Sequence, residues 1–437
     1  MENRVRSIAL IGGVAVVAVV LLMAQRGQAQ MVASDLAAGY VVFPKVVVDS
    51  TDLFLQGRKV DTLIQLTNTA EAAGTDTGCR VVECAYVDAT KHCTNDVTRP
   101  CRTSHDCATG GICGTTADCQ ERNFWVTLSA GQAIGWSANS GVVLPVEGNC
   151  GGSSQTIPEV PEQFFVGELK CVEVMSETGP PRNANDLKGE ATIYEVAVGV
   201  PPTGGVDVRS YNGIGVQATK SDLSAQSLRC VGGTAQGSTC TLDSQCTGGG
   251  TCLSVLCLGA NLAPGAVCGT ATYAGCPSQL ILNHWFDGAF NMPNATDPIT
   301  TDLTLVPCTE DLRLVGAAVT PATTVQFLIY NEFEQRFSSS TSLRCFKETQ
   351  LSQLDTLPGN ENASIFSYAV QGTLVGQTTI RPVNGTELDK GHGLLGIAEE
   401  FVHGTAAFPR GSDAFDLHYS GRTSGKADVV TLHVSVP

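Results

Sequence analysis

"DTLIQLTNT", from Asp61 to Thr69, is a short run of apolar and β-branched residues that aspartate and asparagine bound. This composition is typical of a β-strand that ends in a turn. Similar runs follow at 81–87 ("VVECAYV"), 124–128 ("FWVTL") and 325–330 ("VQFLIY"). A strand, a polar turn and then a strand that carries a cysteine is the local order of immunoglobulin-like sandwiches, so the predicted fold class is all-β.

A weak internal repeat extends this prediction. Gln65 precedes Cys84 by the same number of residues as Gln326 precedes Cys345, and both glutamines lie in strand-like runs. We therefore expect two tandem immunoglobulin-like β-sandwich domains, at 36–297 and 298–437.

Composition supports a globular, β-rich chain without basic binding surfaces. Hydrophobic residues make up 43% of the 437 residues, which is enough for real cores, and only 16% are charged. The 47 glycines suit short strands joined by turns. The formal net charge of −16 argues against nucleic acids and anionic membrane surfaces as partners, because these recruit basic patches.

The amino terminus has the pattern of an export signal. Arg4 and Arg6 precede an apolar run at 8–24, and small residues follow at Gly27 and Ala29. We expect cleavage after Ala29, so that residues 1–29 are a signal peptide and the mature protein is secreted or lies on the outer cell surface. The alternative is an uncleaved membrane anchor. No other apolar stretch is long enough to span a membrane.

Eighteen cysteines in an exported chain predict disulfides. "CRTSHDCATGGIC" at 101–113 and "CTLDSQCTGGGTC" at 240–252 share the spacing C-x5-C-x5-C. We interpret both as disulfide-knotted loop insertions of the first domain, at about 93–119 and 228–277. The expected sets are Cys93, Cys101, Cys107 and Cys113, and Cys230, Cys240, Cys246 and Cys252. Each set allows three pairings, and the sequence does not choose among them.

Two further disulfides are expected outside the insertions. The second half contains only Cys308 and Cys345, so these two pair if no bridge crosses between the domains. Cys171 is the proposed partner of Cys84.

Motifs of known chemistry are absent from the sequence. No C-x2-C pair occurs, which argues against zinc ribbons, thioredoxin-like centres and covalent haem, and no cofactor or metal is predicted. A secreted hydrolase stays open as an alternative, with a metal centred on histidine or with distant carboxylates. Its candidate residues are His392, Glu399, Glu400, His403 and His418, and the carboxylates Glu168, Glu310, Asp311, Glu332 and Glu334.

Trp125 is the candidate binding residue. In "NFWVTLS" the alternation places Phe124, Val126 and Leu128 on one face and Trp125 on the other. There it would stack on a sugar ring or a partner side chain, as in a carbohydrate-binding module, unless the neighbouring insertion covers it.

The combination of "GYVVFPKVVVD" (39–49), "FLIYNEFEQRFS" (327–338) and the cysteine insertions resembles uncharacterised exported cysteine-rich β-sandwich proteins of environmental Gram-negative bacteria. The resemblance implies export and architecture but no activity. The expected function is that of a non-enzymatic binding or assembly component. Its partner would be an extracellular protein or a glycan, and its sheet edges would allow self-assembly by strand addition.

Overall fold

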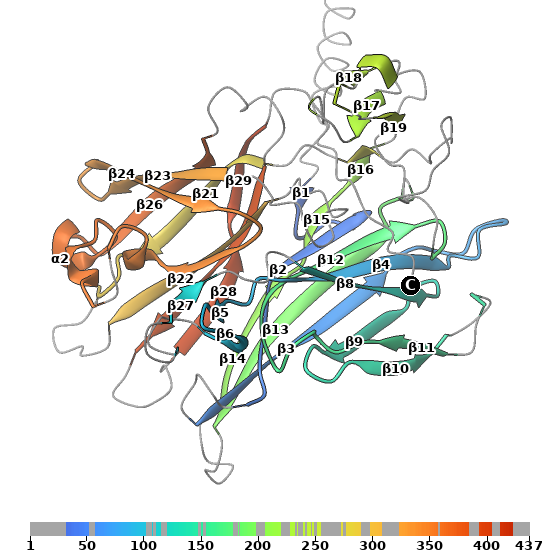
Figure 1. Cartoon of the computed structure of the whole chain (residues 1–437), viewed down its shortest axis with the longest axis horizontal. Coiled ribbons are helices and arrows are strands. Elements are labelled where there is room, and N and C mark those ends of the chain that lie inside the picture. The colour runs from blue at the N-terminus through green and yellow to red at the C-terminus, as the bar shows by residue number, and fades with distance from the viewer. Residues whose placement is uncertain are drawn as a thin grey trace, which may run out of the picture.

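The structure of the chain is a computed structural model (Figure 1). It describes residues 32–51, 57–101, 107, 111–114, 120–146, 150–151, 154–177, 182, 184–197, 206–219, 228–231, 234, 239–240, 243–245, 247–248, 251–254, 272–273, 277–289, 298–307, 323–356, 359–383, 393–403 and 411–422. Over these residues the protein is all-β, with antiparallel sheets, as the sequence predicts. No helix in this part of the chain is long and apolar enough to cross a membrane.

The first unit is one large antiparallel sheet that divides into two layers. Its strand order is β14-β13-β3-β2-β12-β4-β8, with β9 beside β3, β15 beside β2 and β1 beside β15. Strands β2 and β3 pair only at Asp49 and Val60, where the layers part. The strands are β1 (Val32–Ala33), β2 (Tyr40–Asp49), β3 (Arg58–Asn68), β4 (Arg80–Asp88), β8 (Gln120–Leu128), β9 (Ala133–Ser137), β12 (Phe164–Val174), β13 (Leu187–Ala197), β14 (Val206–Asn212) and β15 (Ile214–Val216). A hairpin of β10 (Val142–Pro145) and β11 (Ser154–Ile157) adjoins them.

Alternation along β3 explains how this unit forms a core. Ile64 and Leu66 are fully buried, whereas Leu63, which immediately precedes Ile64 and faces the other way, is 42% exposed. Across the core, the Trp136 indole nitrogen of β9 donates a hydrogen bond to the Tyr86 hydroxyl of β4 at 2.8 Å. A buried indole needs such a partner, so this bond fixes how the two layers face each other.

The second unit is a sandwich of two antiparallel sheets that enclose a separate core (Figure 1). The five-stranded sheet contains, in spatial order, β24 (Arg336–Leu343), β23 (Thr323–Asn331), β26 (Val375–Pro382), β21 (Pro277–Trp285) and β29 (His418–Arg422). The four-stranded sheet contains β25 (Lys347–Gln350), β22 (Ile299–Pro307), β27 (Leu394–Val402) and β28 (Gly411–Asp416). Short helices η3 (Leu351–Gln353), η4 (Glu361–Ala363) and α2 (Tyr368–Gln371) close one end.

This topology changes one expected boundary. Strand β21 lies within the range 36–297 assigned to the first domain, but it pairs with β26 and β29 of the second unit. Leu280 and Leu282 of β21 are fully buried in the second core. The local sequence around β21 is strand-like in either unit, so only the pairing decides to which unit it belongs.

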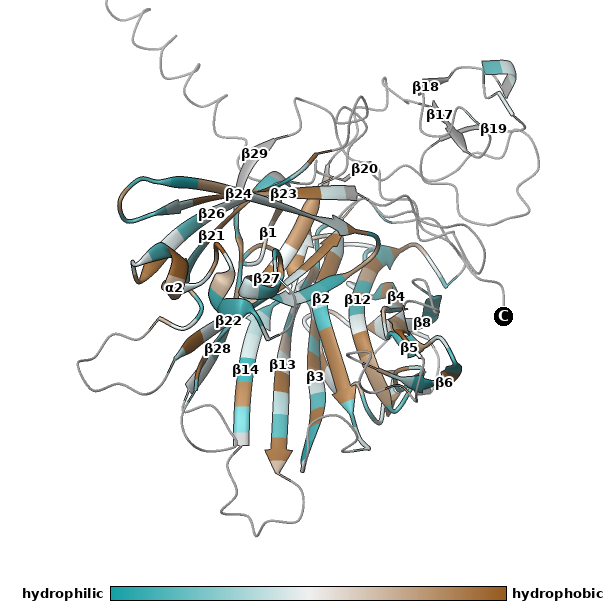
Figure 2. Ribbon diagram, turned by 60° about the vertical axis from the view of Figure 1, so that its left-hand side comes forward, coloured by the Kyte–Doolittle hydropathy of each residue, from teal (hydrophilic) through white to brown (hydrophobic). Residues whose placement is uncertain are grey.

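Buried charges lie where the two units meet. Lys45 of β2 pairs with Glu399 of β27, and its Nζ lies 2.8 Å from a Glu348 carboxylate oxygen of β25. Arg209 of β14 donates to Glu399 at 2.8 Å and lies over the Phe401 ring at 4.9 Å. Figure 2 shows β14 and β28 side by side at this junction. Because buried charges need partners, this network depends on both units at once.

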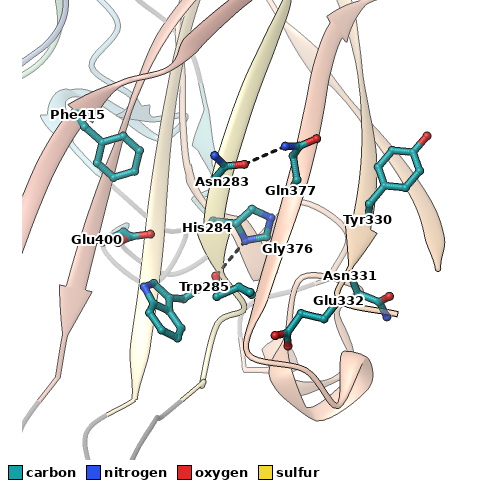
Figure 3. A pocket seen from close by; sticks show the side chains of 11 residues that line it. Asn283, His284, Trp285, Tyr330, Asn331, Glu332, Gly376, Gln377, Glu400 and Phe415 are labelled. Atoms are coloured by element: carbon teal, nitrogen blue, oxygen red, sulfur yellow. Dashed lines mark hydrogen bonds between the residues drawn. The ribbon is translucent and has the colours of Figure 1, made fainter. Parts of the chain in front are cut away.

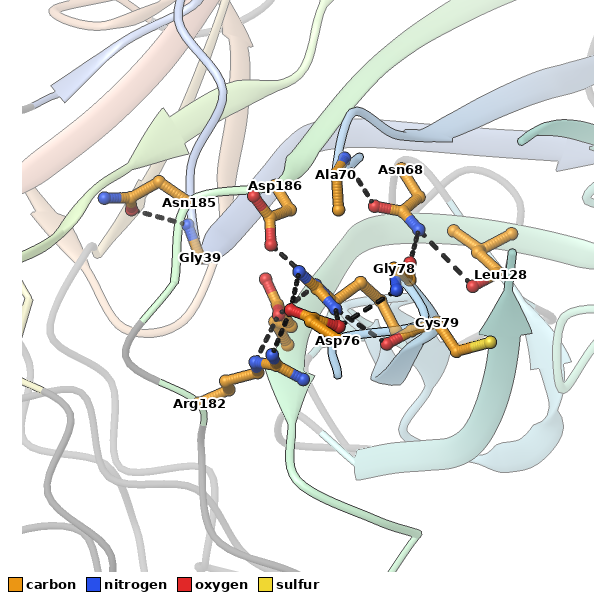
Figure 4. Close-up of polar contacts among 12 residues, drawn as sticks. Gly39, Asn68, Ala70, Asp76, Gly78, Cys79, Leu128, Arg182, Asn185 and Asp186 are labelled. Carbon is orange, nitrogen blue, oxygen red and sulfur yellow. Dashed lines mark hydrogen bonds and ion pairs between the residues drawn. The ribbon is translucent and has the colours of Figure 1, made fainter. Parts of the chain in front are cut away.

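A second ion-pair cluster holds the turn before β4 (Figure 4). Arg80 donates to Asp76 at 3.0 Å and to Asp186 at 2.6 Å, and Arg182 reaches Asp76 at 3.1 Å. A disulfide between Cys79 and Cys150, which the sequence analysis did not identify, lies next to this turn. The ion-pair cluster and the disulfide together fix the turn that precedes β4.

The predicted cysteine set of the first insertion forms two bridges. Cys93 pairs with Cys107 and Cys101 with Cys113, across a small sheet of β5 (His92–Cys93), β6 (Asp96–Pro100) and β7 (Cys113–Gly114). The sulfurs of Cys93, Cys101 and Cys107 lie within 4.8 Å of one another because the two bridges are adjacent. Disulfides therefore account for this cysteine cluster without a metal ion.

The second insertion repeats the first in backbone register. Its strands are β17 (Leu228–Val231), β18 (Thr239–Cys240) and β19 (Thr251–Ser254), with η2 (Asp243–Gln245), and a two-stranded ladder of β16 (Ala218–Thr219) and β20 (Thr272–Tyr273) precedes and follows them. Cys230 lies opposite Cys252 in β17 and β19, as Cys93 lies opposite Cys113 in β5 and β7. The central strand is flanked on both sides in each insertion.

This shared register predicts how the four cysteines of the second insertion pair. One of them, Cys246, lies outside the described residues. We expect bridges Cys230–Cys246 and Cys240–Cys252, since the same register brings the same cysteines together. Non-reducing peptide mapping by mass spectrometry would detect them. Peptides that join Cys230 to Cys240 or Cys252 would contradict the prediction.

The other two expected bridges have different outcomes. Cys84 and Cys171 are bridged, but they lie directly opposite each other on neighbouring strands β4 and β12 of one sheet. In immunoglobulin domains the characteristic bridge instead links the two sheets. Cys345 is disulfide-bonded, and its expected partner Cys308 lies outside the described residues.

Candidate binding groove on the second sandwich

A groove of about 560 Å³ lies on the second unit, at one end of the five-stranded sheet (Figure 3). Strands β21, β23 and β26 form it, and β27 and β28 of the other sheet contribute Glu400 and Phe415. The groove therefore lies on a rigid, hydrogen-bonded sheet and not on a loop.

Strand alternation produces the floor of the groove. In β21, Leu282 and His284 face the core, so Asn283 faces outward and is exposed. In β26 the same alternation exposes Gln377, which lies directly opposite Asn283. The Gln377 amide nitrogen donates to the Asn283 amide oxygen at 3.1 Å, which leaves the other amide groups of the pair directed at solvent.

Aromatic rings flank this amide pair. Tyr330 of β23 is 39% exposed on one side, and half-buried Trp285 of β21 lies on the other, beside Glu400 (Figure 3). Tyr330 and Gln377 are opposite residues, so the order across the sheet is Tyr330, Gln377, Asn283. Rings at both sides of a hydrogen-bonding floor are suited to a ligand with both apolar faces and hydroxyl groups.

Two carboxyl groups lie at the groove. Glu332 accepts a hydrogen bond from the Leu374 backbone at 3.0 Å. Burial raises the pKa of Glu400, although a hydrogen bond from the Trp285 backbone opposes this shift. Neither lysine nor arginine occurs among the 11 lining residues, so the groove disfavours anionic ligands.

His284 supports the groove from beneath. Its Nδ1 lies 3.0 Å from the Trp285 carbonyl oxygen, and its Nε2 lies 2.8 Å from the Thr378 hydroxyl. Because a carbonyl only accepts, Nδ1 carries the proton and Nε2 accepts from Thr378. Burial lowers the pKa of His284 to about 4, so the ring is neutral at neutral pH and holds β21 against β26.

Trp125, the binding residue suggested by the sequence, lies elsewhere, on β8 of the first unit. Phe124, Val126 and Leu128 are buried on the opposite face, as the alternation predicts. Trp125 itself is half-buried, and its indole nitrogen is buried without a hydrogen-bond partner. Glu83 lies directly opposite it on β4. Trp125 is thus partly covered, and its role as a binding residue stays a prediction.

Of the described candidate metal and catalytic residues, Glu332 and Glu400 line the groove, and the others lie apart from it. Glu399 faces Lys45 and Arg209, whereas Glu400 on the other face of β27 reaches Trp285. The His403 ring nitrogen lies 2.7 Å from the Thr300 hydroxyl.

The remaining candidates are also separated. His418 is exposed at the start of β29, and Glu168 pairs with Lys170 inside the first unit. Glu334 is exposed in the β23–β24 turn, where its φ is +60°. His392, Glu310 and Asp311 lie outside the described residues.

The groove residues were missed by the sequence analysis, except for Glu332 and Glu400 among the hydrolase candidates. A signal existed, because Asn283 and Gln377 interrupt apolar strands at outward positions. Only strand pairing shows that these two positions are adjacent.

No protein-family model matches the chain, and a search of curated proteins finds no match.

Proposed function

We propose that this chain is an exported, non-enzymatic binding protein that holds a carbohydrate in the groove of its second sandwich. The single observation that carries the proposal is the amide pair Asn283–Gln377 between the rings of Tyr330 and Trp285. Carbohydrates present apolar ring faces and hydroxyl groups together, which this combination of side chains complements.

The rest of the chain fits a location of this groove outside the cell. Disulfides support export, because they persist in oxidising compartments. A cleaved signal at residues 1–29 belongs to the proposal. A tandem immunoglobulin-like arrangement also belongs to the proposal. The facing layers of each unit support it, whereas the Cys84–Cys171 bridge, which lies within one sheet, does not.

Binding is favoured over hydrolysis by the positions of the two carboxyl groups. Glu400 of β27 lies beside Trp285, whereas Glu332 lies beyond the end of β23, and His284 lies between the two carboxyl groups in this view (Figure 3). Glycosidases instead place two carboxyl groups close to one scissile bond.

The binding prediction concerns the amide pair. Replacing Asn283 and Gln377 together with alanine should weaken glycan binding at least about tenfold, since tenfold is 1.4 kcal/mol and the variant loses several hydrogen bonds. The measurement is retention of the mature protein on cellulose, xylan, mannan, chitin and starch, followed by calorimetric titration with the retained glycan.

Ser340→Ala is the matched control, because Ser340 is exposed on β24 of the same sheet but does not line the groove. It should bind like the wild type. If the wild type is retained on none of these polysaccharides, or the double variant binds equally well, the proposed function is wrong.

A further inference from the structure

We infer that the ligand is a non-acidic oligosaccharide that crosses β23, β26 and β21, with Tyr330 and Trp285 as two separate subsites. This inference rests on the proposed function and adds to it the length and the charge class of the ligand.

The length follows from strand register. Tyr330, Gln377 and Asn283 form one row across three neighbouring strands, and Trp285 lies two residues further along β21. Strand spacing and rise place the Tyr330 and Trp285 backbones roughly 12 Å apart. One sugar ring cannot stack on both side chains at that separation, so each ring serves a different unit of a chain.

The arrangement between the rings supports the same conclusion. The amide pair lies in the row of Tyr330, with Asn283 two residues before Trp285 on β21, and it leaves hydrogen-bonding groups directed outward. A chain that lies across the strands would place the hydroxyls of its middle unit over this pair. Because all these side chains stand on paired strands, little ordering is needed on binding.

The charge class follows from the lining of the groove. Glu332 and Glu400 contribute its only formally ionisable acidic groups, and no cation lines it. Uronic acid or sulfated units would meet like charge without a compensating arginine or lysine. Neutral or basic sugar units meet no such cost.

The test uses the full mature chain. Oligomers of one to six units, hydrolysed from the polysaccharide that the wild type retains, are titrated by calorimetry, with oligogalacturonides as the acidic series. We expect affinity to rise at least tenfold from one unit to four and then level off. Oligogalacturonides should bind at least tenfold more weakly than neutral oligomers of equal length.

Ring variants separate the two subsites. Tyr330→Ala, at a partly exposed position, should lower the affinity for the four-unit oligomer at least about fivefold and change that for a single unit less. Trp285→Phe keeps a ring and the fold and should have a smaller effect on both. The inference is overturned if a single unit binds as tightly as four, if Tyr330→Ala affects all lengths equally, or if the acidic series binds best. Each of these outcomes leaves the proposed function standing, whereas a wild type that binds no glycan overturns both.

Discussion

Lys45→Met should lower the free energy of unfolding by about 3–5 kcal/mol, because it leaves buried carboxylates without their cation. Lys45 is 4% exposed, and Glu399 beside it is fully buried. Burial alone would lower the pKa of Lys45, yet Glu348, Glu399 and Asp302 together raise it above its usual value. The ammonium group is therefore held charged where β2 of the first unit meets β25 and β27 of the second.

Urea unfolding followed by circular dichroism would measure this loss. Lys59→Met is the matched control, since Lys59 is exposed on β3 and its replacement should change stability by less than about 0.5 kcal/mol. Adding Glu399→Leu to Lys45→Met should recover part of the loss, because it removes a buried carboxylate that would otherwise keep Arg209 as its cation without Lys45. A Lys45→Met protein as stable as the Lys59→Met protein would show that the ion pair does not hold the two units together.

Stability should fall as the pH rises from 5 to 8.5, contrary to the usual behaviour of carboxylates in ion pairs. Burial raises the pKa of Glu83 to about 8 and that of Asp416 to about 7. Burial also raises the pKa of Glu173 to about 7. The folded state keeps these protons above pH 4–5, where the unfolded chain releases them. Their stabilising contribution is complete below the unfolded pKa and is lost as the pH rises through the folded pKa.

Asp76 causes a loss of folding stability at low pH. A hydrogen bond from Arg80 and one from the Gly78 backbone lower the pKa of Asp76 to about 2. Its contribution is therefore lost as the pH falls from about 4 toward 2. We expect maximal stability near pH 4–5.

Glu83→Gln isolates one of the groups behind the loss at high pH. Between pH 5 and pH 8.5 the variant should lose less unfolding free energy than the wild type, by on the order of 2–4 kcal/mol. The reason is that each unit of pKa shift corresponds to about 1.4 kcal/mol. Melting temperatures at pH 5, 7 and 8.5 would measure this difference. Glu71→Gln, at an exposed position, should keep the slope of the wild type. Equal slopes for the two variants would mean that Glu83 is ionised in the folded protein.

Local pattern was enough to predict the strands but not their partners. "DTLIQLTNT" lies in β3 up to Asn68, and "FWVTL" lies in β8 with the expected face buried. Strand β21 was assigned to the wrong unit because its residues suit either sheet, and pairing is a non-local property. The Cys79–Cys150 bridge was missed for the same reason, since cysteine spacing does not determine pairing.

The candidate site was predicted less well than the fold. The sequence pointed to Trp125 because a tryptophan on a polar face is conspicuous, yet its indole is partly covered in the structure. Asn283, Gln377 and Tyr330 come from three strands that are distant in the sequence, and each alone resembles an ordinary outward-facing residue.

The sequence by itself determined the all-β class, the cysteine set of the first insertion and the buried face of β8, because alternation and turn composition act within a few residues. Tertiary structure alone decided which strands pair, how Lys45 and Glu399 meet, and where a groove opens. Those features join residues far apart in the sequence, 94 positions for Asn283 and Gln377 and 354 for Lys45 and Glu399. They arise because a buried charge or an open backbone edge must find its partner in the folded chain.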